Sequence, residues 1–245
     1  MAGAQKRRSN GEDDSDSRIG LFPDMKITAL GLDFEQQAAA EGFRFVAGVD
    51  EVGRGCLAGA VVAAACILDP DKPLPEGLND SKQIPPEKRE EIAEELKQNV
   101  IAWAVGQVEA DEIDQINILQ ATKKAMRLAI EALQPKADFL LIDAVTLKEA
   151  YLPQKAIIKG DSISASIAAA SILAKTYRDK LMRELDETYP GYGFASHVGY
   201  ATRVHWEALR VQGPCALHRM TFRGVVPDRE DGRDEFLLVG NSQGR

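Results

Sequence analysis

Two adjacent acids at the end of an apolar run are the residues in this sequence best suited to chemistry. Asp50 and Glu51 directly follow the apolar segment 43–49. Burying a carboxylate without a partner is costly, so a core strand gains nothing by ending in two charges. Because adjacent strand side chains point to opposite faces, only one of the two acids can continue the core face. The simplest interpretation is a strand that delivers Asp50 to a cation, with Glu51 reaching the same region from the strand end.

A Gly-Arg-Gly turn follows these acids and precedes a second apolar run. Gly53 and Gly55 remove side chains at a place where something must approach the backbone closely, and Arg54 supplies a donor suited to phosphate. An ordinary hairpin turn is the alternative, as an exposed turn start is for the two acids. The apolar strands on both sides of the turn favour the chemical interpretation.

Two further aspartates stand at the ends of predicted elements. Asp143 ends the short strand predicted at 138–143 (DFLLID), where an ordinary strand-terminal Asp that opens a loop is the alternative. Carboxylates at the ends of neighbouring strands converge, however, and strand ends are where open α/β sheets bind ligands. Asp161 immediately precedes a predicted long helix, where an N-cap is expected.

The elements that must position these residues follow from the pattern of apolar residues. Strands are predicted at 43–50, 58–68, 100–108, 138–143 and 155–159, and helices at 33–41, 86–98, 111–133 and 162–187. Three strands followed by alternating helix and strand indicate an α/β fold, a mixed five-stranded sheet flanked by helices. Residues 189–226 would form a C-terminal helical appendage.

Composition limits the classes of protein that fit. The 245 residues carry a net charge of −8, which argues weakly against a nucleic-acid partner, but residues 172–223 carry a local excess of three positive charges. Residues 1–22 are predicted to be a disordered tail and 227–245 a flexible one, leaving 23–226 as the catalytic domain. No apolar run is long enough to span a membrane and the N-terminus lacks a signal-peptide core.

The cysteines and histidines lack the spacing of metal sites. Three cysteines without a CxxC pair argue for a reducing, cytoplasmic setting and against disulfides or zinc. His205 is predicted to be a surface helix residue. Ser171, Lys175 and Arg178 on the long helix would face either a substrate or solvent.

Several segments together resemble type 2 ribonucleases H, specifically bacterial ribonuclease HII. The resemblance spans roughly residues 43–226 and is carried by six pieces in the family's order. These are FRFVAGVDEVGRGCLAGAVVAAACIL (43–68), LNDSKQI (78–84), LLIDAV (140–145), IIKGDSISASIAAASILAKTYRD (157–179), YGFASHVGYAT (192–202) and GPCALHRMTF (213–222). The resemblance implies a ribonuclease H-like fold.

The resemblance also implies an activity and its residues. Members of this family are metal-dependent endonucleases that hydrolyse the RNA strand of RNA–DNA hybrids and cut 5′ of ribonucleotides embedded in duplex DNA, leaving 5′-phosphate and 3′-hydroxyl ends. It maps Asp50, Glu51, Asp143 and Asp161 onto the catalytic, metal-binding carboxylates. Four carboxylates without His or Cys prefer Mg²⁺ or Mn²⁺, and two such ions about 3.5–4 Å apart would serve a two-metal mechanism.

Substrate contacts are implied in the same way. The backbone of Gly53-Arg54-Gly55 would sense the ribose 2′-hydroxyl, the group that separates RNA from DNA. Tyr200 would stack on the sugar at the RNA–DNA junction, its alternative being a core or rim tyrosine. Asn79, Ser81 and Lys82 would donate to phosphates, although a capped helix start would also explain Ser81. His218 and Arg219 match a family segment that packs the appendage.

Some positions depart from the family pattern. Ala60 stands where relatives usually have Pro, and Ser196 and Val198 stand where they often have lysines, which predicts a weaker attraction for phosphate. The alternatives that remain are another ribonuclease H-like nuclease of the resolvase or transposase kind, a type 3 ribonuclease H, and a hybrid-binding module without catalysis. A ribose-sensing turn and four intact carboxylates favour a monomeric ribonuclease HII.

Overall fold

A mixed five-stranded sheet forms the centre of the protein. In the computed structural model, which describes residues 29–226, the strand order is β3-β2-β1-β4-β5. The strands are β1 (Val46–Val52), β2 (Val61–Ile67), β3 (Ala102–Val108), β4 (Phe139–Asp143) and β5 (Gln154–Ile157). β2 pairs antiparallel with β1 and with β3, whereas β4 runs parallel to β1 and β5 parallel to β4. All five predicted strands are present, and the two tail predictions lie outside the described residues.

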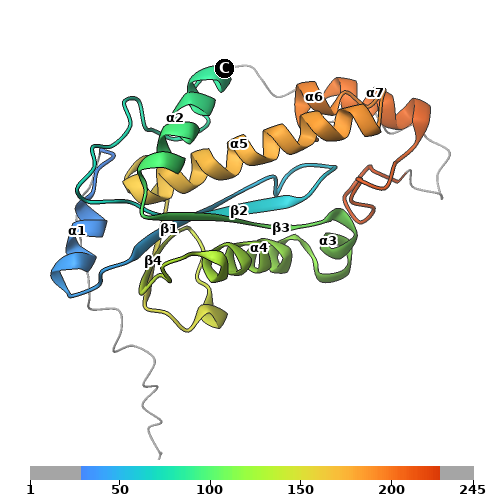
Figure 1. Cartoon of the computed structure of the whole chain (residues 1–245). Coiled ribbons are helices and arrows are strands. Elements are labelled where there is room, and N and C mark those ends of the chain that lie inside the picture. Colours follow the sequence, from blue (N-terminus) through green and yellow to red (C-terminus); the bar gives the residue numbers. More distant parts are fainter. Residues whose placement is uncertain (1–28, 227–245) are drawn as a thin grey trace, which may run out of the picture.

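Helices cover both faces of this sheet. They are α1 (Asp33–Ala40), α2 (Pro86–Asn99), α3 (Ala110–Ile116), α4 (Ile118–Ala132), α5 (Ala165–Thr188), α6 (Phe194–His197) and α7 (Arg203–Gln212). α2 and α5 lie over one face and α4 over the other, while α6 and α7 lie beyond the end of α5 (Figure 1). None of the helices in this region of the chain is long and apolar enough to cross a membrane.

Small residues bring the long helix α5 close to the sheet. All of β2 is buried, and its Ala-rich sequence leaves little bulk on either face. A side chain added at Gly48 of β1 would lie 2.1 Å from the backbone of Ser166, so only glycine fits under the first turn of α5. This close approach fixes the distance between α5 and β1.

Two predicted helices differ from those observed. The helix predicted at 111–133 is broken into α3 and α4 at Asn117, whose φ of 67° is not helical. Its side chain accepts hydrogen bonds from the amides of Leu119 and Gln120, so it caps α4. The helix predicted from 162 begins at Ala165, and its N-cap is Ser164, whose hydroxyl accepts from the Ile167 amide. Asp161 instead lies in a short 3₁₀ turn, Gly160–Ser162, so the N-cap interpretation of Asp161 is wrong.

Three histidines form a buried cluster in the appendage. His205 is fully buried, so its predicted surface position is wrong. Its ring stacks on His197 with centroids 4.4 Å apart, and its Nε2 shares a hydrogen bond of 3.0 Å with Nε2 of His218. Burial lowers the pKa of His205 and of His218 to about 4, because a charged imidazole would lose its hydration. The appendage therefore packs around His205 and His218 in their neutral forms.

The lowered pKa values of His205 and His218 predict how the stability of the protein changes in acid. Their folded-state pKa lies below the unfolded value, so the unfolded chain binds more protons between about pH 4 and 6.5. Their contribution to stability is complete above that window and is lost as the pH falls through it. We expect His218→Asn, which keeps an acceptor for the Cys215 amide, to show a weaker rise in urea midpoint between pH 4.5 and 7 than the wild type. An unchanged pH dependence would contradict this assignment.

Candidate active site

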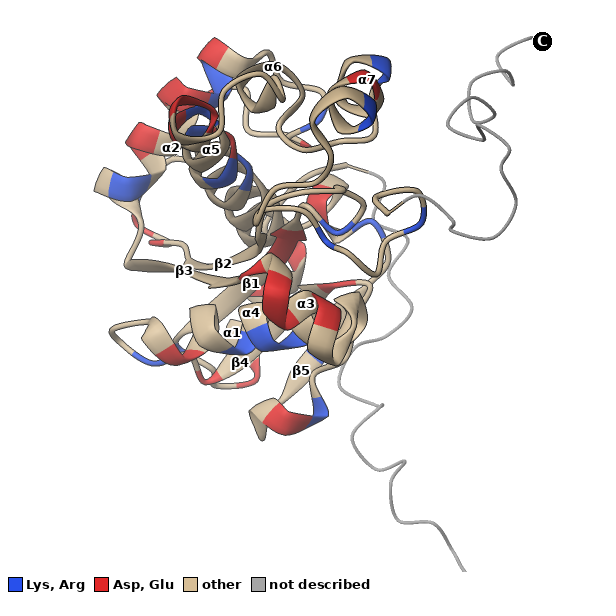
Figure 2. Cartoon of the chain, turned by 90° about the vertical axis from the view of Figure 1, so that its right-hand side faces the viewer, with Lys and Arg blue, Asp and Glu red and all other residues tan. Residues whose placement is uncertain are grey.

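The parallel pairing of β1 and β4 brings two acids together. Val49 of β1 is in register with Ile142 of β4, so the next residues along the strands, Asp50 and Asp143, lie side by side at the carboxyl ends. Asp50 points to the face covered by α5, and Glu51 to the opposite face. Acidic segments lie around the end of β1 in Figure 2, with basic segments on the neighbouring loops.

Asp50 is the most deeply buried of these acids, at 5% exposure. Loss of hydration, with repulsion from Glu51 and Asp143, raises its pKa well above the ordinary value, and a hydrogen bond from Ser171 of α5 opposes the rise. The ionised form of Asp50 is thus disfavoured by its surroundings. A positive charge placed here would relieve that penalty.

The ionised forms of Glu51 and Asp143 are also disfavoured by their surroundings. Burial raises the pKa of both, and each is also repelled by a neighbouring aspartate. Arg54 donates to Glu51 Oε1 at 3.0 Å, and the Gly160 amide donates to Asp143 Oδ1 at 2.8 Å. The other oxygen of Glu51, Oε2, is buried without a hydrogen-bond partner in the described structure. Glu51 Oε2 is therefore available to bind a non-protein ligand.

Asp161 joins this group from the turn before α5. It is 6% exposed, and Lys82 Nζ lies 3.3 Å from its Oδ2. Burial alone would lower the pKa of Lys82, but the carboxylates of Asp161, Asp80 and Asp50 raise it overall. Lys82, on the loop between β2 and α2, therefore acts as a counter-charge to the acids.

The four acids have the chemistry of a hard-metal site. Within residues 29–226, no group of three or more His, Cys, Asp or Glu side chains is arranged to hold a metal ion. The oxygens are turned instead toward Arg54, Lys82 and the Gly160 amide. Raised carboxyl pKa values and the unpartnered Glu51 oxygen fit a divalent cation with oxygen ligands, such as Mg²⁺ or Mn²⁺, and the lack of sulfur or imidazole does not favour Zn²⁺.

The turn after β1 is held from behind by two buried arginines. Arg178 of α5 donates to the carbonyls of Ala58, Ala60 and Val198, so the expectation that it faces substrate or solvent is wrong. Arg219 donates to the carbonyls of Gly53, Arg54 and Gly59. Both side chains are completely buried.

The position of Arg178 explains why residue 53 is a glycine. Its φ of 89° is in the left-handed region, and an added Cβ would lie 2.3 Å from Nε of Arg178. What approaches its backbone closely is thus a protein side chain. At Gly55, by contrast, an added Cβ would meet open space.

Tyr200 lies beside this turn and is 40% exposed. The ammonium of Lys175 is 5.7 Å from the centre of its ring. The carbonyl of the preceding residue, Gly199, accepts a hydrogen bond of 2.8 Å from the Leu57 amide. The exposed ring and the Gly-Arg-Gly turn are therefore parts of one rigid surface.

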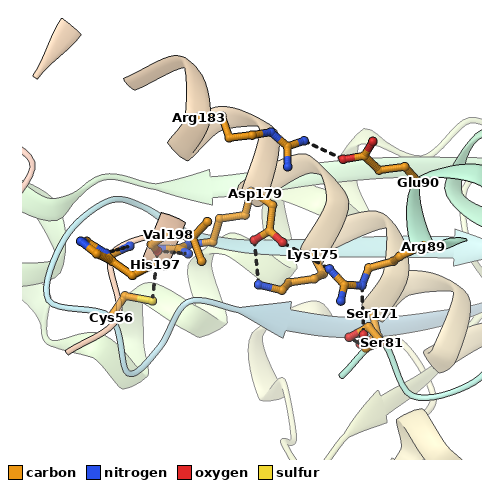
Figure 3. A network of polar contacts seen from close by, with 12 residues as sticks. Cys56, Ser81, Arg89, Glu90, Ser171, Lys175, Asp179, Arg183, His197 and Val198 are labelled. Atoms are coloured by element: carbon orange, nitrogen blue, oxygen red, sulfur yellow. Dashed lines mark hydrogen bonds and ion pairs between the residues drawn. The ribbon is translucent and has the colours of Figure 1, made fainter. Parts of the chain in front are cut away.

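A chain of polar contacts joins the loop at 78–84 to α5 (Figure 3). Ser81, predicted to donate to phosphate, is buried, and its hydroxyl is 2.9 Å from that of Ser171, the residue that bonds Asp50. Arg89 of α2 donates to the Ser81 carbonyl and to Asp179, which also receives Lys175 at 2.7 Å. Ser81 thus supports Asp50 through Ser171, whereas Asn79 and Lys82 remain exposed on the same loop.

Comparison with known proteins bears on this arrangement. A sequence model of the family described as Ribonuclease HII matches residues 47–225. The ribonuclease HII of Solibacter usitatus is 53% identical over 191 residues, covering 78% of this chain and 83% of that protein. The ribonuclease HII of Syntrophotalea carbinolica is 49% identical over 207 residues, 84% of this chain and 98% of that protein.

The chain belongs to the ribonuclease HII family. Solved structures agree: ribonuclease H2 from Pyrococcus horikoshii has a TM-score of 0.63 at 26% identity, covering 74% of this chain and 95% of that one. A ribonuclease HII from Archaeoglobus fulgidus, solved in complex with PCNA, has a TM-score of 0.63 at 27% identity. The match covers 74% of this chain and 96% of that one. A ribonuclease HIII solved with Mn²⁺ has a TM-score of 0.57 at 21% identity, a similarity that supports the fold alone. The predictions of a ribonuclease H-like fold and of a metal-dependent endoribonuclease are confirmed.

Sequence reasoning missed part of this ribonuclease HII site. It left the roles of Ser171 and Arg178 open and gave Arg219 a packing role without linking it to the turn. A serine within an alanine-rich helix face that packs on a sheet was the available signal for Ser171, because a buried hydroxyl needs a partner. The arginines gave no comparable signal, since their acceptors are backbone carbonyls far away in the sequence.

Asp143→Asn tests the metal-site assignment. The amide oxygen still accepts from Gly160, but the charge is lost. We expect cleavage to fall by at least about two orders of magnitude, the scale seen when one electrostatic contact to a reacting group is lost. Metal-free thermal stability should rise, because repulsion among the acids is reduced. Rates with Mn²⁺ and melting curves in chelator measure both, and a near-normal rate would refute the assignment.

Asp161→Asn and Ser164→Ala separate chemistry from helix capping. We expect Asp161→Asn to slow cleavage strongly with little change in unfolding free energy, because Asp161 does not cap α5. Ser164→Ala should cost at least about 1 kcal/mol of stability, because it removes the cap and the hydrogen bond that Ser164 donates to Glu35, while the rate of folded protein stays close to wild type. Denaturant curves and initial rates on both variants decide. A fast Asp161→Asn enzyme would remove Asp161 from the catalytic set.

Proposed function

We propose that this protein cuts RNA strands paired with DNA, and also cuts 5′ of single ribonucleotides embedded in duplex DNA. The observation that carries the proposal is the placement of four acids, three of which have raised pKa values, beside a turn whose residues Arg54 and Gly55 are exposed. A cluster of acids attracts divalent cations, and an exposed backbone turn next to it offers contacts to a sugar. The products would carry 5′-phosphate and 3′-hydroxyl ends.

The proposed cofactor is Mg²⁺ or Mn²⁺, with two ions used during catalysis. Asp50, Glu51, Asp143 and Asp161 would hold them, and the present partners Arg54 and Lys82 would become available to phosphate. When bound, such ions supply an activated water and stabilise the leaving oxygen. The protein's own part is to fix the acids, which it does through the Gly160 amide and through Ser171.

The proposed substrate-reading surface combines the turn and its neighbours. The backbone of residues 53–55 would meet the ribose 2′-hydroxyl, and Tyr200 would stack against the sugar at the junction. Asn79 and Lys82, exposed on one loop, would contact phosphates and position the strand without reading its sequence. Ser196 and Val198 have uncharged side chains, so neither adds positive charge here; Ser196 is exposed and donates to the Gly193 carbonyl, and the Val198 carbonyl accepts from Arg178. A monomeric state and a cytoplasmic location stay predictions.

Sugar dependence of cutting tests this function. We expect a duplex with one ribonucleotide to be cut on the 5′ side of that residue with Mg²⁺ or Mn²⁺ and not with chelator. The same duplex with a 2′-deoxy or 2′-O-methyl sugar should bind weakly through its phosphates and remain uncut. Mapping the cut on end-labelled strands measures this. Equal cutting of the all-DNA duplex would favour a resolvase-like nuclease.

Tyr200→Ala tests the stacking surface. We expect cleavage of a single embedded ribonucleotide to slow about tenfold, the scale of one lost aromatic stacking contact, with Mn²⁺ binding by calorimetry unchanged. Tyr177→Ala is the matched control, because Tyr177 is similarly exposed, at 41%, but donates to Gln107 of the edge strand β3. Equal rates for the two variants would place Tyr200 outside the substrate surface.

A further inference from the structure

Arg219 donates four hydrogen bonds to the turn that follows β1. Its NH1 donates to the Arg54 carbonyl at 2.9 Å, and its NH2 to the carbonyls of Gly53 at 2.7 Å and Gly59 at 2.8 Å. Its Nε also donates to Gly59, at 3.1 Å. Burial lowers the pKa of this guanidinium only to about 10, so it is charged at neutral pH. Apart from the Phe222 ring, 5.0 Å away, the neighbours of this buried charge are carbonyl acceptors, an expensive arrangement that calls for a role beyond filling space.

These contacts set the direction in which two peptide groups point. In a trans peptide unit the carbonyl and the following N–H lie on opposite sides. Because the Gly53 carbonyl faces the buried Arg219, the Arg54 N–H points away from it. The same holds for the Arg54 carbonyl and the Gly55 N–H. Arg219 thereby turns two consecutive donors toward the exposed side of the turn.

The two donors are open to a ligand. Arg54 and Gly55 are both exposed, and no hydrogen bond from either amide is made within the described part of the chain. The position that a Gly55 side chain would occupy has no atom within 4 Å. A pair of adjacent, outward amides next to the acids is suited to an oxygen acceptor, such as the hydroxyl oxygen of a sugar.

We propose that Arg219 is a positioning residue for sugar discrimination, which holds the Arg54 and Gly55 amides in the orientation that receives the ribose 2′-hydroxyl. This rests on the proposed function, since it assigns the selectivity of that same site to a residue of the C-terminal appendage. Orientation before binding removes the cost of ordering the turn when substrate arrives. The appendage therefore takes part in the choice between RNA and DNA without touching the substrate.

Arg178 provides a matched comparison for a purely structural role. It is as buried as Arg219 and is also bonded only to backbone carbonyls, but those belong to Ala58, Ala60 and Val198. It packs against Gly53 but makes no hydrogen bond to the peptide groups that carry the Arg54 and Gly55 amides. Loss of either arginine should destabilise the fold, whereas only loss of Arg219 should release the two amides.

The experiment compares Arg219→Lys with Arg178→Lys, each combined with Asp143→Asn so that substrate is bound but not cut. Dissociation constants are measured for a duplex with one ribonucleotide and for its all-deoxy equivalent, with Mn²⁺, at a temperature where both variants are folded. We expect Arg219→Lys to lose about tenfold of the preference for the ribonucleotide duplex, roughly one well-aligned hydrogen bond, and Arg178→Lys to keep it. Equal preference in the two variants would overturn the proposal.

A second measurement needs no arginine variant, in case neither folds. Amide-resolved hydrogen exchange on Asp143→Asn should show Arg54 and Gly55 exchanging quickly in the free protein. They should be protected by the ribonucleotide duplex and not by the all-deoxy duplex. Equal protection by both duplexes would overturn the proposal, even if the enzyme cuts only at ribonucleotides. A wild-type enzyme that cuts both duplexes equally would instead refute the proposed function itself.

Discussion

Repulsion between carboxylates at the ends of β1 and β4 is the constraint that shapes this site. The parallel register makes Asp50 and Asp143 neighbours, and burial removes much of the water that would otherwise screen them. Each remaining contact of the acids offsets part of this repulsion. Arg54 and Lys82 supply positive charge, and Ser171 and the Gly160 amide supply donors. A fold that keeps such a cluster without a full set of counter-charges is prepared to bind cations.

The same constraint explains why helix α5 is central to the molecule. Its N-terminal half packs on β1 through alanines and across Gly48, which leaves room for Ser171 to reach Asp50. One turn further on, Lys175 contacts the ring of Tyr200, and Arg178 then reaches the turn that follows β1. A single rigid helix therefore sets the relative positions of the acids, the turn and the exposed ring. Rigid support of this kind is what a site needs when the geometry of its ligands decides the rate.

The C-terminal appendage is joined to the turn more closely than its place in the chain suggests. Leu57 and Gly59 donate their amides to Gly199 and Leu217, and Arg219 returns hydrogen bonds to Gly53 and Arg54. The buried cluster of three histidines, in which His205 and His218 have lowered pKa values, holds the appendage together from within. Conditions that protonate those histidines would weaken the support of the turn as well as the appendage, because the two share one set of backbone contacts.

Local sequence pattern was sufficient to predict the class of fold and the residues best suited to catalysis. Apolar periodicity gave five strands and the principal helices, since that periodicity is a local consequence of which side chains must be buried. The motifs indicated the ribonuclease HII family and therefore the four acids, whose ligand roles remain predictions. Local pattern failed where long-range contacts decide. Asn117 breaks a helix whose periodicity continues across it, and Ser164, not Asp161, caps α5.

Tertiary packing sets which polar residues are exposed near the acids and which are buried within the framework. Ser81, His205, Arg178 and Arg219 are polar in the sequence and buried in the fold, each bonded to a partner far along the chain or brought close by the appendage. Backbone carbonyls carry no sequence signature, so an arginine that binds them is indistinguishable in the sequence from one that binds phosphate. The fold removes that ambiguity for Arg178 and Arg219, because the acceptors around their buried guanidinium groups are backbone carbonyls.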